Sequence, residues 1–425
     1  MGKIVSSTAC KKTVLDSGLR IITVERPCTK TLATRVYIKV GSRYDGHFLG
    51  LSHFLEHILF QGSKNYSKKD IYGIVEGFGG KINALTTQEY MCINLVVIYK
   101  YFDQCLDVLA DIIINPNIDE SDIASEKLVV AEEIKRELDT EHIVFDAFSH
   151  AIWLRHLLRN PILGNLTDVN KIQLEHVKAH YHKYFTPDNT VIAIAGNFKY
   201  DSIIPKIKNK FKNYNKPYEG NKISFPKNIH EPPILEKREV FMPMDIHQTH
   251  LVLGWHGVGM NHKDKHALKL LDRILGTGGS SRLYQRIREK EKLVYNIHST
   301  SFNYEEVGYI AIYAATDPNK VEFVIKSILQ EIEKLQKEPV SNAELASTKT
   351  ALEGSLTLNF ETNYRLAGIY GIEELLHHIE PFDKYLDKIK KVTKEDIQRV
   401  ANKYFNIDNY VCIQVGRSNK GINFK

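Results

Sequence analysis

The hydrophobic and polar positions of the chain alternate in a way that predicts two groups of β-strands, one early in each half. In the first half, residues 13–25 and 32–40 are rich in β-branched residues, and a turn-forming Asp-Ser-Gly interrupts the first of these segments. In the second half, residues 239–242 and 249–255 have the same character. Because β-branched residues favour extended backbone, all four segments are expected to form strands.

Long helices are predicted after each group of strands, because apolar residues then recur at the spacing of one helix face. The segments with this periodicity are 101–114, 120–138, 265–275 and 318–336. Strands followed by helices and a closing strand are typical of an α+β domain. The pattern therefore predicts an α+β fold that is used twice.

An internal repeat supports this duplication. Residues 183–189, Lys-Tyr-Phe-Thr-Pro-Asp-Asn, recur at 403–409 as Lys-Tyr-Phe-Asn-Ile-Asp-Asn. Both copies lead into an apolar stretch that ends in glycine, at Gly196 and at Gly416. A segment repeated near the end of each half is expected when one domain occurs twice in a chain. We therefore predict two homologous domains.

The boundary between the domains is predicted from composition. Residues 213–233 contain four prolines and one glycine and show little periodicity, which is typical of a linker. This linker separates a first domain at 1–212 from a second domain at 234–425. The expected architecture is a clamshell of two α+β domains, each with a mixed sheet plus helices.

Composition excludes several classes of protein. The chain has 425 residues, and its 57 basic and 51 acidic residues give a net charge of +6 without a basic tail, so nucleic-acid binding is not expected. Its five cysteines are scattered and form no CxxC pair, which indicates reduced thiols. No stretch approaches the length of a membrane span, and the N-terminus has no apolar signal core. We expect a soluble, cytoplasmic protein.

The clearest chemical motif is His53-Phe-Leu-Glu56-His57. On a helix, His53 and His57 lie one turn apart on the same face, where both imidazoles can reach one ion, and Glu56 lies beside them. Two histidines and a carboxylate suit zinc, which lowers the pKa of a bound water. A glutamate that does not bind the metal can then accept the proton. This HxxEH order is the inverzincin signature.

A hydrolytic zinc site needs a third protein ligand, and the helix predicted at 120–138 supplies four candidates. They are Glu126, Glu132, Glu133 and Glu137. Glu126 and Glu133 are seven residues apart and share a helix face, whereas Glu132 is rotated about 100° away. One of the two could bind the metal while the other orients a ligand imidazole. The other interpretation is a solvated acidic face.

Together these motifs resemble the pitrilysin/insulinase family of zinc peptidases, in particular its short branch with the processing peptidases. Further landmarks in both halves are similar to those of the family, namely Gly41-Ser42-Arg43, Asn83-Ala84, Ser281-Arg282-Leu283, Arg288-Glu289-Lys290 and Tyr295. The acidic residue usual after Gly-Ser-Arg is Asp45 here. Gln61 replaces a lysine that often follows the metal helix, and this departure changes none of the proposed ligands.

The resemblance implies roles for individual residues. It implies one zinc ion per chain, with Glu133, 76 residues after His57, as the third ligand and Glu126 as a residue that supports the site. It also implies that the segment around Asn83 and Ala84 is a sheet edge that binds substrate as an added strand. Without the resemblance, this segment could equally be an internal hairpin.

The resemblance also implies that Arg288 and Tyr295 act on the substrate carbonyl. Without it, this pair would be interpreted as a surface arginine and a core tyrosine.

The expected function is zinc-dependent endopeptidase activity on peptides or unfolded precursor segments, with removal of a leader sequence as the expected task. Glu56 is the expected base, and Tyr295 is expected to stabilise the oxyanion. One alternative is a non-specific oligopeptidase, and another is a non-catalytic scaffold or regulatory subunit. A homodimer or a heterodimer with a paralogous subunit is the expected assembly, without nucleic acid or membrane as a partner.

Overall fold

The computed structural model describes residues 10–136, 140–214, 223, 225, 229–376 and 380–417. The predicted linker at 213–233 therefore lies largely outside the described residues. The chain forms two compact units. The first comprises residues 1–136, 160–227 and 357–380, and the second comprises 137–159, 228–356 and 381–425.

The sheet of the first unit has six strands in the order β1-β2-β6-β3-β5-β4. Their bounds are β1 Cys10–Val14, β2 Arg20–Glu25, β3 Thr31–Ile38, β4 Lys81–Thr86, β5 Met91–Ile98 and β6 Thr190–Gly196. Strands β2 and β6 pair in parallel, and the other neighbours pair antiparallel. Strand β4 has a neighbour on one side only, so it forms an edge of the sheet.

The sheet of the second unit has five strands in the order β7-β11-β8-β10-β9. Their bounds are β7 Arg238–Pro243, β8 Thr249–His256, β9 Val294–Asn303, β10 Gly308–Thr316 and β11 Val411–Gly416. Strands β11 and β7 pair in parallel, as β6 and β2 do in the first sheet. Apart from β1, the two sheets have the same order and directions, which confirms the predicted α+β class.

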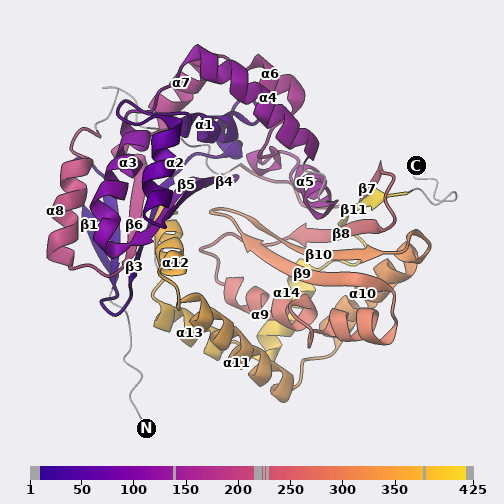
Figure 1. The fold of residues 1–425 in the computed structure, drawn as a ribbon. Coiled ribbons are helices and arrows are strands. Elements are labelled where there is room, and N and C mark those ends of the chain that lie inside the picture. The colour runs from indigo at the N-terminus through magenta and orange to yellow at the C-terminus, as the bar shows by residue number, and fades with distance from the viewer. Residues whose placement is uncertain are drawn as a thin grey trace, which may run out of the picture. The chain divides into compact units, whose positions relative to one another are not determined.

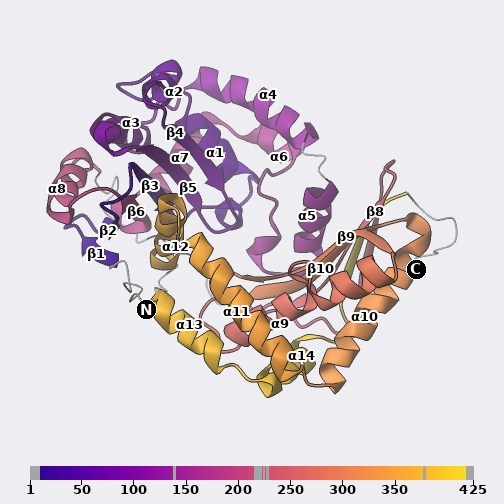
Figure 2. The same ribbon diagram turned by 60° about the horizontal axis from the view of Figure 1, so that its bottom comes forward.

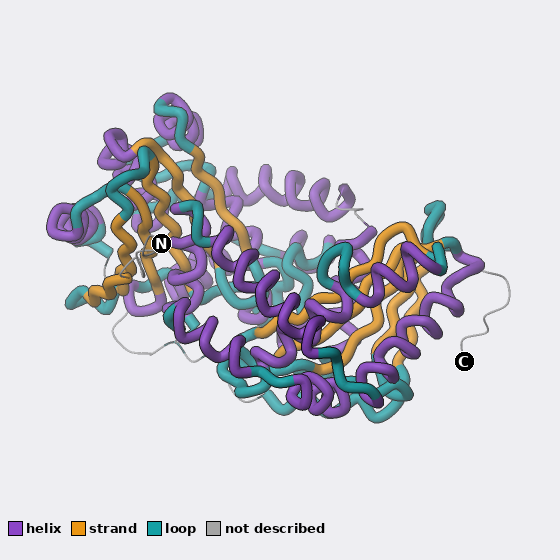
Figure 3. Tube along the Cα trace, turned by 90° about the horizontal axis from the view of Figure 1, so that it is seen from below, coloured by secondary structure: helices purple, strands orange, loops and turns teal. Residues whose placement is uncertain are grey.

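Helices surround both sheets (Figure 3), and the predicted helical segments are all present. In the first half the helices are α1 Leu51–Leu59, α2 Lys68–Gly77, α3 Phe102–Ile114, α4 Glu120–Arg136, α5 Thr140–Ile152, α6 Leu166–Lys171, α7 Leu174–Tyr184 and α8 Tyr200–Lys210. In the second half they are α9 Lys265–Gly276, α10 Val321–Lys337, α11 Asn342–Asn359, α12 Asn363–Leu375, α13 Phe382–Lys391 and α14 Lys394–Tyr404. Among the described residues, no helix is both long and apolar enough to cross a bilayer.

Two helices are exchanged between the halves of the chain (Figures 1 and 2). Helix α5, from the first half, packs on strands β8 and β11 of the second unit, where Val144 and Phe148 are fully buried. Helix α12, from the second half, packs on β2, β3 and β6 of the first unit through Leu366 and Leu375. The units therefore differ from the contiguous domains expected at 1–212 and 234–425. Helical periodicity shows that a face is apolar but not which sheet it covers.

Close packing of α12 depends on a glycine in the middle of the helix. A Cβ added to Gly371 would lie 2.3 Å from Cε2 of Tyr37 and 2.9 Å from Cβ of Ala193. Tyr37 is fully buried, and its hydroxyl donates a hydrogen bond to the carbonyl of Gly368 at 3.2 Å. The ring therefore has little freedom to move away, and glycine is what allows the helix to approach the sheet.

We expect Gly371→Ala to lower the free energy of unfolding by about 1–2 kcal/mol. Overpacking of a core costs about 1–3 kcal/mol, and the better helix propensity of alanine returns up to about 1 kcal/mol. Gly354→Ala is the matched control, because a Cβ added to this exposed glycine of α11 would meet no atom within 4 Å. Urea denaturation should show the control unchanged or slightly stabilised, and equal stability of the two variants would contradict the packing argument.

Candidate metal centre

Helix α1, which carries the HxxEH motif, is held at its N-terminus by a buried carboxylate. Asp45 accepts hydrogen bonds from the backbone N–H of Gly50 at 2.8 Å and of Ser52 at 2.9 Å, and from the Ser52 hydroxyl at 2.5 Å. A negative group at this end satisfies unpaired N–H groups and complements the helix dipole. Asp45 therefore anchors the start of the helix immediately before His53.

A histidine from α7 completes this anchor. Nε2 of His180 lies 2.9 Å from the Ser52 hydroxyl oxygen, and both residues are buried. Burial raises the pKa of Asp45 to about 7, although the hydrogen bonds from Ser52 and Gly50 favour its charged form. Burial also lowers the pKa of His180 to about 3, so its ring is neutral. Sequence reasoning noted Asp45 only as a family landmark and did not identify His180.

The structure brings His53, His57 and Glu133 together. Oε2 of Glu133, on the last turns of α4, lies 3.3 Å from Nε2 of His57 and 3.8 Å from Nε2 of His53. The two imidazole rings are 4.7 Å apart and nearly perpendicular. One ligand atom from each residue lies within 4.8 Å of the others, and no second cluster of this kind occurs in the described part of the chain.

This spacing fits a zinc ion. Ligands at about 2.1 Å from zinc in a tetrahedron lie about 3.4 Å from one another, close to the separations between Glu133 and the two imidazoles. Two nitrogens and one oxygen are a donor set that zinc accepts, with a fourth position open. The Glu133 side chain is 35% exposed, so the cluster is accessible from solvent on that side.

The other glutamates of α4 are separated as helix geometry predicts. Oε2 of Glu126 lies 3.0 Å from Nδ1 of His57, on the side of the ring away from Glu133. Glu132 is 57% exposed and pairs with Lys135 at 2.9 Å. Glu137 lies outside the described residues. Glu126 therefore contacts a ligand imidazole, and Glu133 alone of the described candidates faces both histidines.

The two imidazoles have opposite electrostatic surroundings. Desolvation, together with the charge of His57, lowers the pKa of His53 to about 4. Desolvation also acts to lower the pKa of His57, but hydrogen bonds to Glu126 and Glu133 outweigh it and raise the pKa to about 9. The hydrogen bond from His57 in turn lowers the pKa of Glu133. In the protein without a metal ion, His57 is therefore the imidazole that is positively charged, and His53 is neutral.

Glu56 lies beside the cluster but has a different partner. The hydroxyl of Thr86, the last residue of β4, donates a hydrogen bond to Oε2 of Glu56 at 2.5 Å. Burial raises the pKa of Glu56, and this hydrogen bond opposes the shift. A carboxylate with a raised pKa outside the ligand set is suited to proton transfer. Thr86 was not identified from the sequence as a site residue.

Strand β4 is an edge strand, as predicted for the segment around Asn83 and Ala84. The backbone N–H of Ala84 donates to Oδ1 of Asn83 at 2.9 Å. Helix α1 packs against β4, and Thr86 contacts Glu56 from the same strand. The edge therefore adjoins the cluster, and its role in binding substrate stays a prediction.

Arg288 and Tyr295 both belong to the second unit. Arg288 lies in a π-helical segment, Tyr284–Lys290, where its guanidinium is 4.8 Å from the ring centre of Tyr284. Tyr295, on β9, is 66% exposed. This exposure excludes the interpretation of Tyr295 as a core residue, while the catalytic roles of the pair stay predictions.

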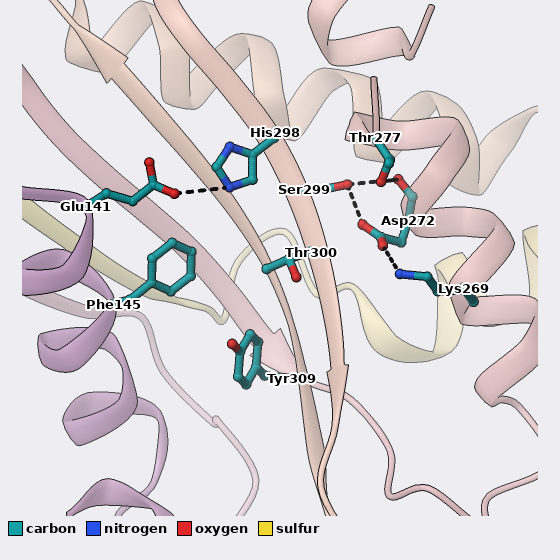
Figure 4. A pocket seen from close by; sticks show the side chains of 9 residues that line it. All are labelled: Glu141, Phe145, Lys269, Asp272, Thr277, His298, Ser299, Thr300 and Tyr309. Atoms are coloured by element: carbon teal, nitrogen blue, oxygen red, sulfur yellow. Dashed lines mark hydrogen bonds and ion pairs between the residues drawn. The ribbon is translucent and has the colours of Figure 1, made fainter. Parts of the chain in front are cut away.

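A pocket of about 450 Å³ lies in the second unit (Figure 4). On one side of β9, Oε1 of Glu141 from α5 lies 3.7 Å from Nε2 of His298 from β9. On the other side, the Ser299 hydroxyl donates to Asp272 of α9 at 2.6 Å. The other lining residues are Phe145, Lys269, Thr277, Thr300 and Tyr309. None of the residues of the metal cluster lines this pocket, so the pocket is separate from the candidate metal site.

Comparison with known proteins identifies the family. Residues 20–166 match the model of the insulinase family, peptidase family M16, and residues 171–352 match that of the peptidase M16 inactive domain. A Bacillus subtilis protein named uncharacterized zinc protease YmxG is 32% identical over 401 residues, which cover 94% of this chain and 96% of that protein. This chain belongs to peptidase family M16. The resemblance found in the sequence is thereby confirmed.

Another relative agrees with this chain in extent, and two solved structures agree with it in fold. An uncharacterized zinc protease of Rickettsia felis is 31% identical over 401 residues, which cover 92% of this chain and 94% of that protein. A solved protease from Helicobacter pylori superposes with a TM-score of 0.92 at 25% identity, over 96% of this chain and 99% of that one. A Pseudomonas fluorescens structure described as a peptidase M16 inactive domain has the same fold, with a TM-score of 0.86 at 20% identity.

We expect Asp45→Ala to destabilise the protein, because each buried N–H left without a partner costs about 1–3 kcal/mol. Asp103→Ala is the matched control: Asp103 is likewise an aspartate near the N-terminus of a helix, in the first turn of α3, but it is 56% exposed and pairs with Lys206 at the surface. Loss of an exposed pair costs about 0–1 kcal/mol. Thermal unfolding should therefore distinguish the variants, and equal melting temperatures would contradict the anchoring role of Asp45.

Proposed function

We propose that this protein is a zinc-dependent endopeptidase. The observation that supports the proposal is the convergence of His53, His57 and Glu133 from two helices, with Glu56 beside them and outside the ligand set. Zinc bound there would act as a Lewis acid and lower the pKa of water. The two relatives from Bacillus subtilis and Rickettsia felis are named zinc proteases, and these names support the same activity.

Each residue around the cluster has a proposed task. His53, His57 and Glu133 would hold one zinc ion per chain, and Glu126 would orient His57. Glu56 would accept a proton from the attacking water and deliver it to the leaving amine. Through its hydrogen bond, Thr86 would hold the Glu56 carboxylate in position for this proton transfer. Arg288 and Tyr295 would stabilise the charge that develops on the substrate carbonyl oxygen.

The proposed substrate is an extended peptide or an unfolded segment of a precursor. Strand β4 is an edge of the sheet next to the cluster, and an extended peptide can pair with such an edge through main-chain hydrogen bonds. Removal of a leader sequence is the proposed task, and general degradation of oligopeptides is the second candidate. Mass spectrometry of cleavage in a mixed peptide pool separates them, because one dominant site favours processing and many sites favour degradation.

The proposed assembly is a dimer, either of two copies of this chain or with a paralogous subunit, and the proposed location is the cytoplasm. The five cysteines are all free thiols in the structure, which agrees with a reducing compartment. A non-catalytic subunit is the remaining alternative. It is disfavoured because the full set of His53, Glu56, His57 and Glu133 is present.

We expect Glu56→Gln to keep zinc and to abolish peptide cleavage, because the amide cannot accept a proton. Loss of a general base typically lowers the rate about 10²–10⁴-fold. His57→Ala should lose both zinc and activity. Metal content by mass spectrometry and cleavage of a fluorogenic peptide would be measured on the same samples, and an active Glu56→Gln protein would refute the base.

The third ligand has its own test on α4. Glu133→Gln should weaken zinc binding strongly, because a charged ligand is replaced by a neutral one. The adjacent Glu132→Gln serves as the control, since it makes the same chemical change at an exposed position. Isothermal titration with zinc is expected to separate the two variants. Equal affinities would exclude Glu133 as a ligand.

A further inference from the structure

A chain of hydrogen bonds leads from the protein surface to His57. The ammonium of Lys68, in the first turn of α2, donates to Oε1 of Gln61 at 3.0 Å. Nε2 of Gln61 donates to Oε1 of Glu126 at 2.6 Å. The other oxygen of Glu126, Oε2, lies 3.0 Å from Nδ1 of His57. Four side chains from the region 57–126 are thus connected in series.

The donor and acceptor at each link of this series are determined by chemistry. An ammonium can only donate, so the Gln61 atom facing Lys68 is the carbonyl oxygen, and its NH₂ group must face Glu126. An ionised carboxylate can only accept, so the His57 nitrogen facing Glu126 must carry a hydrogen. Nδ1 is therefore protonated whatever the charge of the ring, and Nε2 is the nitrogen available for a metal.

The two ends of this series of hydrogen bonds differ in their exposure to solvent. The Glu126 side chain is only 5% exposed, so water does not compete strongly for its oxygens. The Lys68 side chain is 56% exposed, and its ammonium is 3.9 Å from Glu126, beyond hydrogen-bond reach. Gln61 is therefore the hydrogen-bond partner of the buried carboxylate on this side, and Lys68 bonds to Gln61 while it also forms a longer ion pair with Glu126.

The second histidine lacks such support. Nδ1 of His53 is buried, and it has no hydrogen-bond partner among the described residues. The protein therefore orients one imidazole of the pair through a polar chain and the other through packing alone. The effect of the chain should be specific to His57.

We propose that Gln61 and Lys68 are positioning residues that fix the protonated nitrogen of His57 and thereby direct its Nε2 toward zinc. This inference rests on the zinc site of the proposed function. Residues that support metal ligands typically change metal affinity about 10–100-fold when they are replaced. The same range is expected for the loss of the Gln61 donor.

The test compares variants at Gln61 by zinc competition with a chromophoric chelator. Gln61→Glu keeps the shape of the side chain but presents an acceptor to Glu126, so zinc affinity should fall by about 10-fold or more. Gln61→Met removes the hydrogen bonds without adding charge and should show a smaller loss in the same direction. Thermal unfolding of each metal-free variant shows that the fold is retained, and Gln61→Met decides the result if Gln61→Glu does not fold.

Lys68 has a matched control in its neighbour. Lys68→Met should weaken zinc binding less than Gln61→Glu, and Lys69→Met should leave it unchanged, because Lys69 is also exposed on the same turn but is not the residue that donates to Gln61. Both changes remove one positive charge. Any general effect of net charge on the cation therefore appears equally in the two variants.

A spectroscopic readout separates orientation from general stability. Nitrogen-15 spectra of the zinc-loaded protein should show His57 with hydrogen on Nδ1, and this signal should be lost or altered in Gln61→Glu. Equal zinc affinity of the Gln61 variants and Lys69→Met, or zinc bound through Nδ1 in the unmodified protein, would overturn the inference. Absence of zinc binding by the unmodified protein would instead overturn the proposed function.

Discussion

The packing of α1 against α4 is the contact on which the site depends. The two helices are distant in sequence, and only their contact brings Glu133 to His53 and His57 and Glu126 to the far side of the His57 ring. The position of α1 is in turn set by a buried carboxylate at its N-terminus and by its packing on α7 and β4. Metal ligands thus sit on rigid elements, which holds them near the geometry an ion requires.

The two halves share a topology but not a chemistry. Helix α9 follows β8 as α1 follows β3, yet His266 is the single histidine of α9, and His262, four residues earlier, lies before the helix begins. The helix therefore does not carry a pair of histidines on one face. This difference agrees with the match of residues 171–352 to the inactive domain of the M16 family. The two halves therefore share the arrangement of strands and helices, whereas the set of metal ligands occurs only once in the described residues.

Much of the fold and of the cluster could be predicted from the sequence, because both follow from regular spacing. Periodicity located the strands and helices, and a separation of four residues in the motif and seven along α4 placed His53, His57, Glu126 and Glu133 on the correct faces. Contacts between distant segments have no such periodic signal. Thr86, His180 and Lys68 are common polar residues whose roles depend on which element packs beside them, and the exchange of α5 and α12 has the same origin.

The exchange of these two helices also bears on how the chain could be divided. A cut within 213–233 would separate the sheet of each unit from one of its covering helices, and would leave side chains such as Ile22, Ala193 and Val191 facing water in one fragment and Val252 and Ile413 in the other. Neither fragment would be a self-sufficient module. If the two fragments were coexpressed, they would instead be expected to behave as a split protein. Each fragment would fold only when the other fragment supplies its missing helix.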